Sequence, residues 1–151
     1  MTEKLRLGIS ERSQILQCLK LNVSIDGLPI SKSTGKQFWP ILCSVIDAVD
    51  NSPFLVGLYC GHTKPDSPES FLVDFIEDAG MLLQSGLMYK GSHFRVSLNA
   101  FICDMPARAF IKGCIGHNGY YGCDKCTQKG VWYGRVVFPK LHCTQRTDSD
   151  F

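Results

Sequence analysis

Three apolar segments rich in β-branched and aromatic residues follow one another between residues 21 and 61, and their closeness constrains the fold most. They read LNVSID (21–26), QFWPILCSVIDAV (37–49) and FLVGLYCG (54–61), and turn-forming residues separate them. Each pattern is typical of a β-strand, and strands so close in sequence pair most simply as an antiparallel meander. Pro40 lacks an N–H, so it predicts an edge, a strand start or a bulge in the second strand.

A well-punctuated helix is predicted after these strands. Ser67 can cap it, Pro68 suits its first turn and Gly86 can end it. Apolar residues recur at helical spacing between Phe71 and Leu83. A fourth strand is expected at 94–103 and a short helix at 106–113. Residues 1–20 predict a short amphipathic helix, because a partial apolar stripe is formed by Ile9, Ile15, Leu16 and Leu19.

The resulting order, β-β-β-α-β-α, is the order of an RNase H-like domain, in which the fourth strand pairs beside the first. A ferredoxin-like sandwich fits less well, because it needs a helix between its first two strands. The fold class expected is therefore α/β, a partial RNase H-like domain with a zinc-knuckle-like Cys/His insertion. The expected organisation is a helical lead-in (1–20), the partial core (21–113), the Cys/His insertion (114–138) and a polar tail (139–151).

Two acidic residues stand where strands are expected to end. Asp26 closes the first strand and Asp104 closes the fourth. Carboxylates on adjacent strand ends can share Mg²⁺ or Mn²⁺, which prefer oxygen ligands, and a pair of such ions can clamp the oxygens of a phosphoryl transfer. The alternative is structural, since Asp26-Gly27 is a common turn dipeptide and Asp104 is a good helix N-cap.

A Cys/His cluster follows the fourth strand. A CxxH and a CxxC, five residues apart, supply four ligands for a tetrahedral zinc site: Cys114, His117, Cys123 and Cys126. His142 and Cys143 are alternative ligands. The alternative without metal packs Cys114 beneath the helix and leaves His117 hydrogen-bonded in the loop. The remaining cysteines lie in apolar surroundings and are expected in the core: Cys18, Cys43, Cys60 and Cys103.

Composition narrows the class of protein. The chain has 151 residues, 44% of them hydrophobic, which suits one compact domain. Its eight cysteines fall short of the ~8–10% of residues typical of disulfide scaffolds. No signal peptide or transmembrane run is evident, so nucleus or cytoplasm is expected, with no membrane partner. Net charge is only +2, but residues 101–151 carry seven Lys and Arg against four Asp.

Four aromatic residues of the Cys/His region could stack on nucleic-acid bases, but packing around the loop is the simpler expectation. They are Tyr120, Tyr121, Trp132 and Tyr133.

The ordered blocks LNVSIDG, QFWPILCSV, FLVGLYCGHTKPDSPESFLVDFIED and AFICDMPARAFIKGCIGHNGYYGCDKC resemble the catalytic region of CACTA-like DNA transposases, in particular their animal transposon-derived forms. The resemblance extends from about Leu21 to Phe138. It implies an RNase H-like fold with a DDE/D metal triad and an inserted CxxC. By position, Asp26 would be the first acid, Asp104 the second, and Cys123 and Cys126 the inserted pair.

The family continues into a His-bearing block and a third acid, which this sequence does not place. Asp148 and Asp150 lie in the polar tail, and Glu77 and Asp78 precede the fourth strand. The chain is therefore expected to be a fragment that is inactive alone, whose full-length parent would bind transposon-end DNA.

The sequence is compatible with two functions. One is an enzyme lineage that cuts and joins DNA by two-metal phosphoryl transfer. The other is a non-catalytic, zinc-stabilised module that binds nucleic acid or protein. A homo-oligomer is compatible with both.

Overall fold

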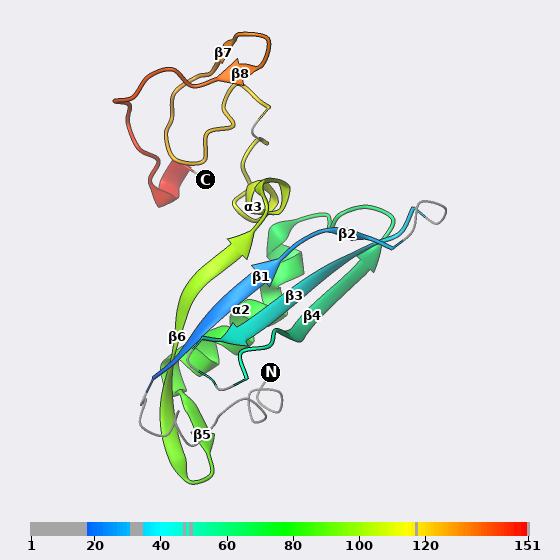
Figure 1. Cartoon of the computed structure of the whole chain (residues 1–151), viewed down its shortest axis with the longest axis vertical. Helices are drawn as coiled ribbons and strands as arrows, with labels where there is room; N and C mark the ends of the chain where they lie inside the picture. The colour runs from blue at the N-terminus through cyan, green and yellow to red at the C-terminus, as the bar shows by residue number, and fades with distance from the viewer. Residues whose placement is uncertain (1–17, 31–34, 47, 49, 117, 151) are drawn as a thin grey trace. The chain divides into compact units, whose positions relative to one another are not determined.

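The computed structural model describes residues 18–30, 35–46, 48, 50–116 and 118–150 as a mixed α/β structure (Figure 1). The larger sheet is mixed and six-stranded, and a second sheet has two strands. The elements are β1 (Cys18–Ile25), β2 (Leu28–Pro29), β3 (Gln37–Val45), β4 (Phe54–Gly61), α2 (Pro68–Ser85), β5 (Leu87–Tyr89), β6 (Ser92–Cys103), α3 (Met105–Ile111), β7 (Val131–Trp132), β8 (Val136–Val137) and the 3₁₀ helix η2 (Asp148–Asp150).

The chain divides into two compact units, Met1–Ile102 and Cys103–Phe151. The boundary thus falls at the end of β6, whereas the expected end of the core was residue 113. The first unit holds the large sheet and α2. The second holds α3, the cysteine-rich loop and the β7–β8 hairpin.

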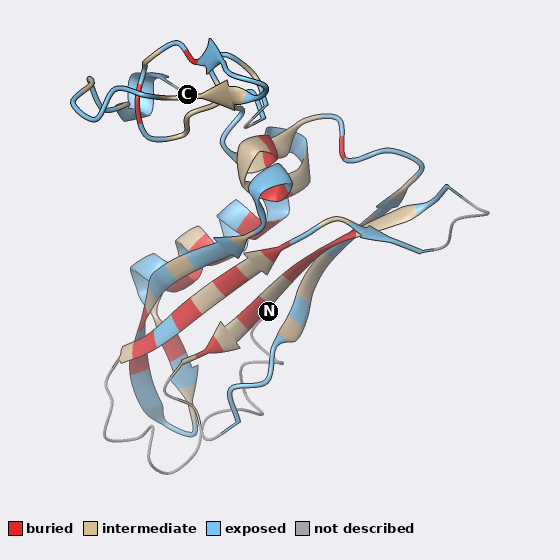
Figure 2. Ribbon diagram, turned by 45° about the horizontal axis from the view of Figure 1, so that its top comes forward, coloured by how far each residue is buried: buried red, intermediate tan, exposed pale blue. Residues whose placement is uncertain are grey.

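The predicted antiparallel meander is present in the first unit. β1 pairs antiparallel with β3, with Val23 opposite Cys43, and β3 pairs antiparallel with β4. Alternate residues of β1 are buried because successive side chains point to opposite faces of the sheet (Figure 2). Pro40 lies opposite Leu58, next to a register shift between Ile41 and Leu42, so the predicted irregularity is confirmed.

β1 also corrects one prediction. Residues 18–20 belong to this strand, so the helix expected over 1–20 is wrong for those three residues, and the rest of it lies outside the described residues. Leu19 is only 2% exposed and packs in a core cluster of the sheet and α2. Leu19 is therefore apolar because it is buried in a strand, and not because it belongs to the apolar face of a helix. The cluster comprises Leu19, Leu21, Val45, Leu82, Leu87, Phe94 and Val96.

The helix α2 confirms its sequence punctuation. The Ser67 hydroxyl accepts a hydrogen bond from the Ser70 N–H at 3.1 Å, and Pro68 opens the helix. Gly86 ends it with φ of +70°, a conformation that favours glycine. The helix packs against the sheet through aromatic side chains, because the rings of Phe75 and Phe101 lie 6.3 Å apart in an edge-on arrangement.

The fourth predicted strand is β6, and it lies beside β1 in the sheet order β2-β3-β1-β6-β5. Figure 1 draws both strands running in the same direction. Asn99 of β6 donates a hydrogen bond from its side-chain amide to the Asn22 side-chain oxygen of β1, at 2.9 Å. The short strand β5, which the sequence did not predict, forms an antiparallel hairpin with β6.

Candidate functional site

Asp26 directly follows the last residue of β1. Its Oδ1 accepts a hydrogen bond from the Gly27 N–H at 2.7 Å, which fixes the carboxylate orientation. A Cβ on residue 27 would lie 2.9 Å from Trp39 Cζ2, so glycine is required for this close approach. The turn predicted at Asp26-Gly27 is wrong, because β2 continues past these residues along the same partner strand β3, with Ile25 opposite Ile41 and Leu28 opposite Phe38. Asp26 therefore holds an exposed carboxylate between two short strands.

Asp104 directly follows β6 and is the N-cap of α3. Its Oδ1 accepts a hydrogen bond from the Ala107 N–H at 2.7 Å. An ionised carboxylate has two oxygens and about four acceptor positions, so a cap hydrogen bond leaves capacity for a metal ion. Asp104 is therefore a helix N-cap, and this role leaves it able to act as a metal ligand as well.

The two cysteines of the CxxC lie together in the second unit. The Cys126 thiol lies 3.3 Å from the Cys123 sulfur, and Cys126 is buried. A third thiol comes from the downstream segment, because the Gln128 side-chain amide donates to both Cys126 Sγ and Cys143 Sγ at 3.3 Å. These three cysteines, with Gln128, are called the thiol cluster below.

Backbone pairing between two short segments builds this cluster. Cys126 forms an isolated antiparallel bridge with Gln145, and the Arg146 N–H donates to the Lys125 carbonyl at 3.0 Å. The Arg146 side chain also donates from Nε to the Cys123 carbonyl at 2.9 Å. The tail expected to be polar and irregular therefore supports the CxxC and supplies its neighbouring thiol.

The hydrogen bonds of the cluster shift two thiol pKa values in opposite directions. The pKa of Cys126 is lowered from 9.0 to about 7, first because Gln128 donates to its sulfur and then because of its hydrogen-bond interactions with Cys123 and Cys143. The pKa of Cys143 is raised, chiefly because its thiol hydrogen-bonds Cys126. A thiolate stabilised by neighbouring donors is the form of cysteine that binds metal.

Replacing Gln128 by Ala should raise the pKa of Cys126 from about 7 toward its ordinary value of 9.0 in the metal-free protein. The lowered pKa of Cys126 contributes stability to the folded state at pH values above the ordinary thiol pKa of 9.0. This contribution is lost as the pH falls through about 7. Ultraviolet absorbance of the thiolate, followed against pH, measures the change. Gln84→Ala, on the exposed face of α2, is the matched control. An unchanged titration in Gln128→Ala would contradict the assignment.

Of the other predicted zinc ligands, the alternative ligand Cys143 lies with the CxxC in the thiol cluster. Cys114 is half-buried and donates to the Lys112 carbonyl at 3.5 Å, while His117 lies outside the described residues. Among the residues that the structure describes, no group of three or more His, Cys, Asp or Glu side chains is arranged to hold a metal ion.

Gln128 was missed in the sequence, although it follows Cys126 by two positions. Side chains two apart share a face of an extended segment, so this spacing was the available signal.

The remaining cysteines divide between core and surface. Cys43 is 1% exposed, and burial raises the pKa of its thiol to about 11. Cys18 and Cys103 are half-buried, whereas Cys60 is exposed, so the core prediction is wrong for Cys60. Cys60 lies on β4, which pairs with β3 alone among the described strands and is therefore an edge strand of the sheet.

A basic cavity of about 570 Å³ lies beside the thiol cluster. Asp124 forms ion pairs with Arg108 at 3.4 Å and with Lys112 at 3.8 Å, which ties α3 to the CxxC loop. The charged residues that line the cavity are Lys112, Asp124, Lys125, Lys140 and Arg146.

Comparison with family models, with curated proteins and with solved structures finds no match. Of the helices in the described part of the chain, none is long and apolar enough to cross a membrane.

Proposed function

We propose that the chain derives from a DNA transposase with an RNase H-like catalytic core. In this proposal Asp26 and Asp104 are the first two carboxylates of a divalent-metal site that performs phosphoryl transfer on DNA in the full-length parent. One observation carries it: β1 and β6 are neighbours in the sheet, and each acid directly follows one of them.

The chemistry of the two residues supports this assignment. The carboxyl ends of neighbouring parallel strands meet at one edge of a sheet, where α/β proteins commonly bind ligands. Bound Mg²⁺ or Mn²⁺ would neutralise phosphate charge and activate the attacking oxygen. The residues' own part is to supply oxygen ligands whose orientation is held by the Gly27 and Ala107 N–H groups.

Iron-mediated cleavage tests the proposal on the chain as it stands. Fe²⁺ in a Mg²⁺ site, with ascorbate and peroxide, generates radicals that cut the nearby backbone. We expect cuts near residues 26 and 104, suppressed by excess Mg²⁺. Mapping the fragments by mass spectrometry checks this, and cuts at neither position, or at only one of them, would contradict a shared site.

The second candidate is a zinc-stabilised module that binds nucleic acid or protein. The sulfurs of Cys123 and Cys126 lie side by side, 3.3 Å apart, which favours it, because two neighbouring cysteine thiolates can separate slightly and bind one zinc ion. His117, with Cys114 or Cys143, would complete the ligand set. Zinc would supply folding energy there, holding the two paired segments together. Elemental analysis of the purified chain tests this candidate, which requires one zinc per chain.

A further inference from the structure

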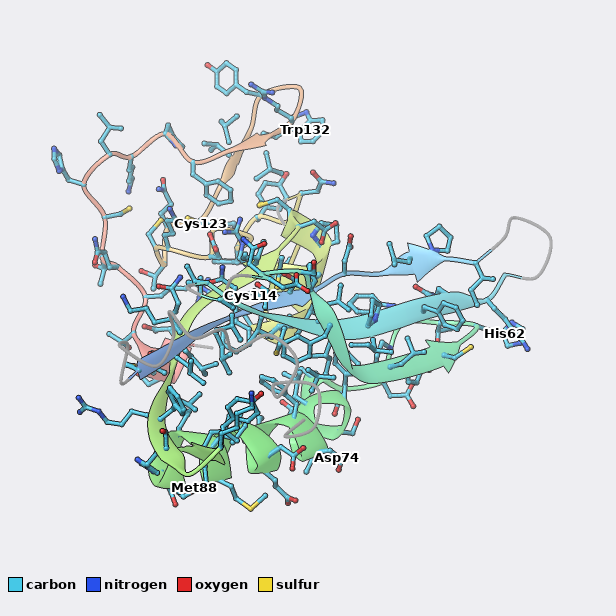
Figure 3. The ribbon with its side chains drawn as sticks, turned by 60° about the horizontal axis from the view of Figure 1, so that its bottom comes forward. His62, Asp74, Met88, Cys114, Cys123 and Trp132 are labelled. Carbon is cyan, nitrogen blue, oxygen red and sulfur yellow. The ribbon has the colours of Figure 1, made fainter. Side chains whose placement is uncertain are left out.

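The β7–β8 hairpin carries two aromatic side chains at its outer end. Val131 lies opposite Val137 and Trp132 opposite Val136, and the Tyr133 N–H donates to the Arg135 carbonyl at 2.8 Å. Gly134, with φ of +69°, supplies the backbone conformation of the turn between β7 and β8. The hairpin is therefore a hydrogen-bonded support for Trp132 and Tyr133 (Figure 3 labels Trp132).

These aromatic side chains are exposed, which corrects the expectation that they pack around the loop. Trp132 is 64% and Tyr133 83% exposed, and Tyr120 and Tyr121 are each 47% exposed. The base of the hairpin is joined to the tyrosine loop, because the Gly130 N–H donates to the Tyr120 carbonyl at 2.6 Å. Four aromatic side chains that are this exposed to solvent on one small unit indicate a binding surface.

The charge of the same unit indicates the class of partner. Residues 103–151 carry seven Lys and Arg against four Asp, a net +3 (seven minus four). Asp124 is already paired with Arg108 and Lys112. Lys129 lies 5.9 Å from the ring centroids of both Tyr120 and Tyr121, so a cation and two aromatic faces are combined. The exposed bases beyond these pairs are Lys125, Lys129, Arg135 and Lys140.

We propose that the β7–β8 hairpin and the Tyr120–Tyr121 loop form a binding site for single-stranded DNA, with unpaired bases stacking on Trp132 and Tyr133. Aromatic faces bind bases that are free to unstack, and nearby lysines and arginines bind the phosphates. A duplex keeps its base faces stacked, so it cannot use the aromatic part of this site. The inference is independent of catalysis at Asp26 and Asp104.

A fluorescence titration of the full chain with a dye-labelled oligothymidine tests the site, in buffer without divalent metal. We expect single-stranded DNA to bind more tightly than a duplex of equal length. Trp132 is exposed, whereas Trp39 is 6% exposed, so stacking should quench mainly the Trp132 emission. Trp132→Ala and Tyr133→Ala should each weaken binding about tenfold, the loss of roughly one stacked base.

Matched variants separate stacking from folding and from charge. Trp132→Phe should keep most of the affinity. Met88→Ala, on the β5–β6 hairpin and 61% exposed, should keep all of it. Lys129→Gln should weaken binding and lower the salt dependence by about 0.7 in the log–log slope.

Three outcomes would overturn the inference. They are equal affinity of Trp132→Ala and the wild type, equal affinity for duplex and single strand, and a self-association that depends on Trp132 in sedimentation with no DNA binding. The last would assign the surface to a second copy of this chain.

Discussion

Asn in place of Asp26 or Asp104 should remove divalent-metal binding at the proposed acidic pair, lowering Mn²⁺ affinity by more than about 100-fold. Changes to residues that merely orient metal ligands already cost about 10–100-fold, so loss of a ligand carboxylate should cost more. Electron paramagnetic resonance of free Mn²⁺ measures this affinity on the chain directly. In an active full-length parent, either change should abolish Mg²⁺-dependent nicking of transposon-end DNA.

The choice of Asn follows from the structure. Asp104 Oδ1 caps α3, and Asn is an equally good N-cap, so Asp104→Asn removes charge while keeping the cap. Asp104→Ala would remove both the charge and the cap, so a loss of metal binding could not be separated from a loss of helix stability. Asp50→Asn is the matched control, because Asp50 is exposed and likewise accepts a neighbouring backbone N–H, from Ser52 at 2.9 Å. Full Mn²⁺ affinity in Asp26→Asn would sink the proposed site.

Local signals in the sequence predicted the first unit closely. The strand 54–61 and the boundaries of α2 agree with the structure, because Ser67, Pro68 and Gly86 act through bonds and backbone angles within a few residues. β5 could not be predicted, since a three-residue strand has no periodicity of its own and exists only by pairing with β6. The burial of β1 similarly overrode the helical spacing read into Leu19.

The candidate sites were less predictable because they depend on contacts between distant segments. The strand-end positions of Asp26 and Asp104 followed from element order, and the sheet order agrees with it. The sequence named Cys143 only as an alternative ligand of the CxxC, and the order of elements did not favour it over Cys114. Cys143 is brought to Cys126 by the pairing of residues 125–127 with 144–146, and two segments without strand periodicity give no sequence signal for such pairing.

Loss of either thiol of the CxxC should abolish zinc binding. In Cys123→Ser and Cys126→Ser, zinc content should fall from one ion per chain to none, because a four-coordinate structural site cannot stay closed without a thiolate. Loss of zinc should also unfold residues 103–151, since the free energy of metal binding in such sites is folding free energy. Removing zinc from the wild type with a chelator should therefore unfold the same residues. Elemental mass spectrometry and near-ultraviolet circular dichroism measure the two effects.

Two further thiols sharpen this experiment. Cys60→Ser removes an exposed thiol of β4 and should leave zinc content at one. Cys143→Ser should lower zinc affinity more than Cys114→Ser, because Cys143 shares the Gln128 amide with Cys126, whereas Cys114 donates to the Lys112 carbonyl. A Cys126→Ser chain that still binds one zinc with wild-type affinity would show that the CxxC pair is held only by Gln128 and Arg146, without metal.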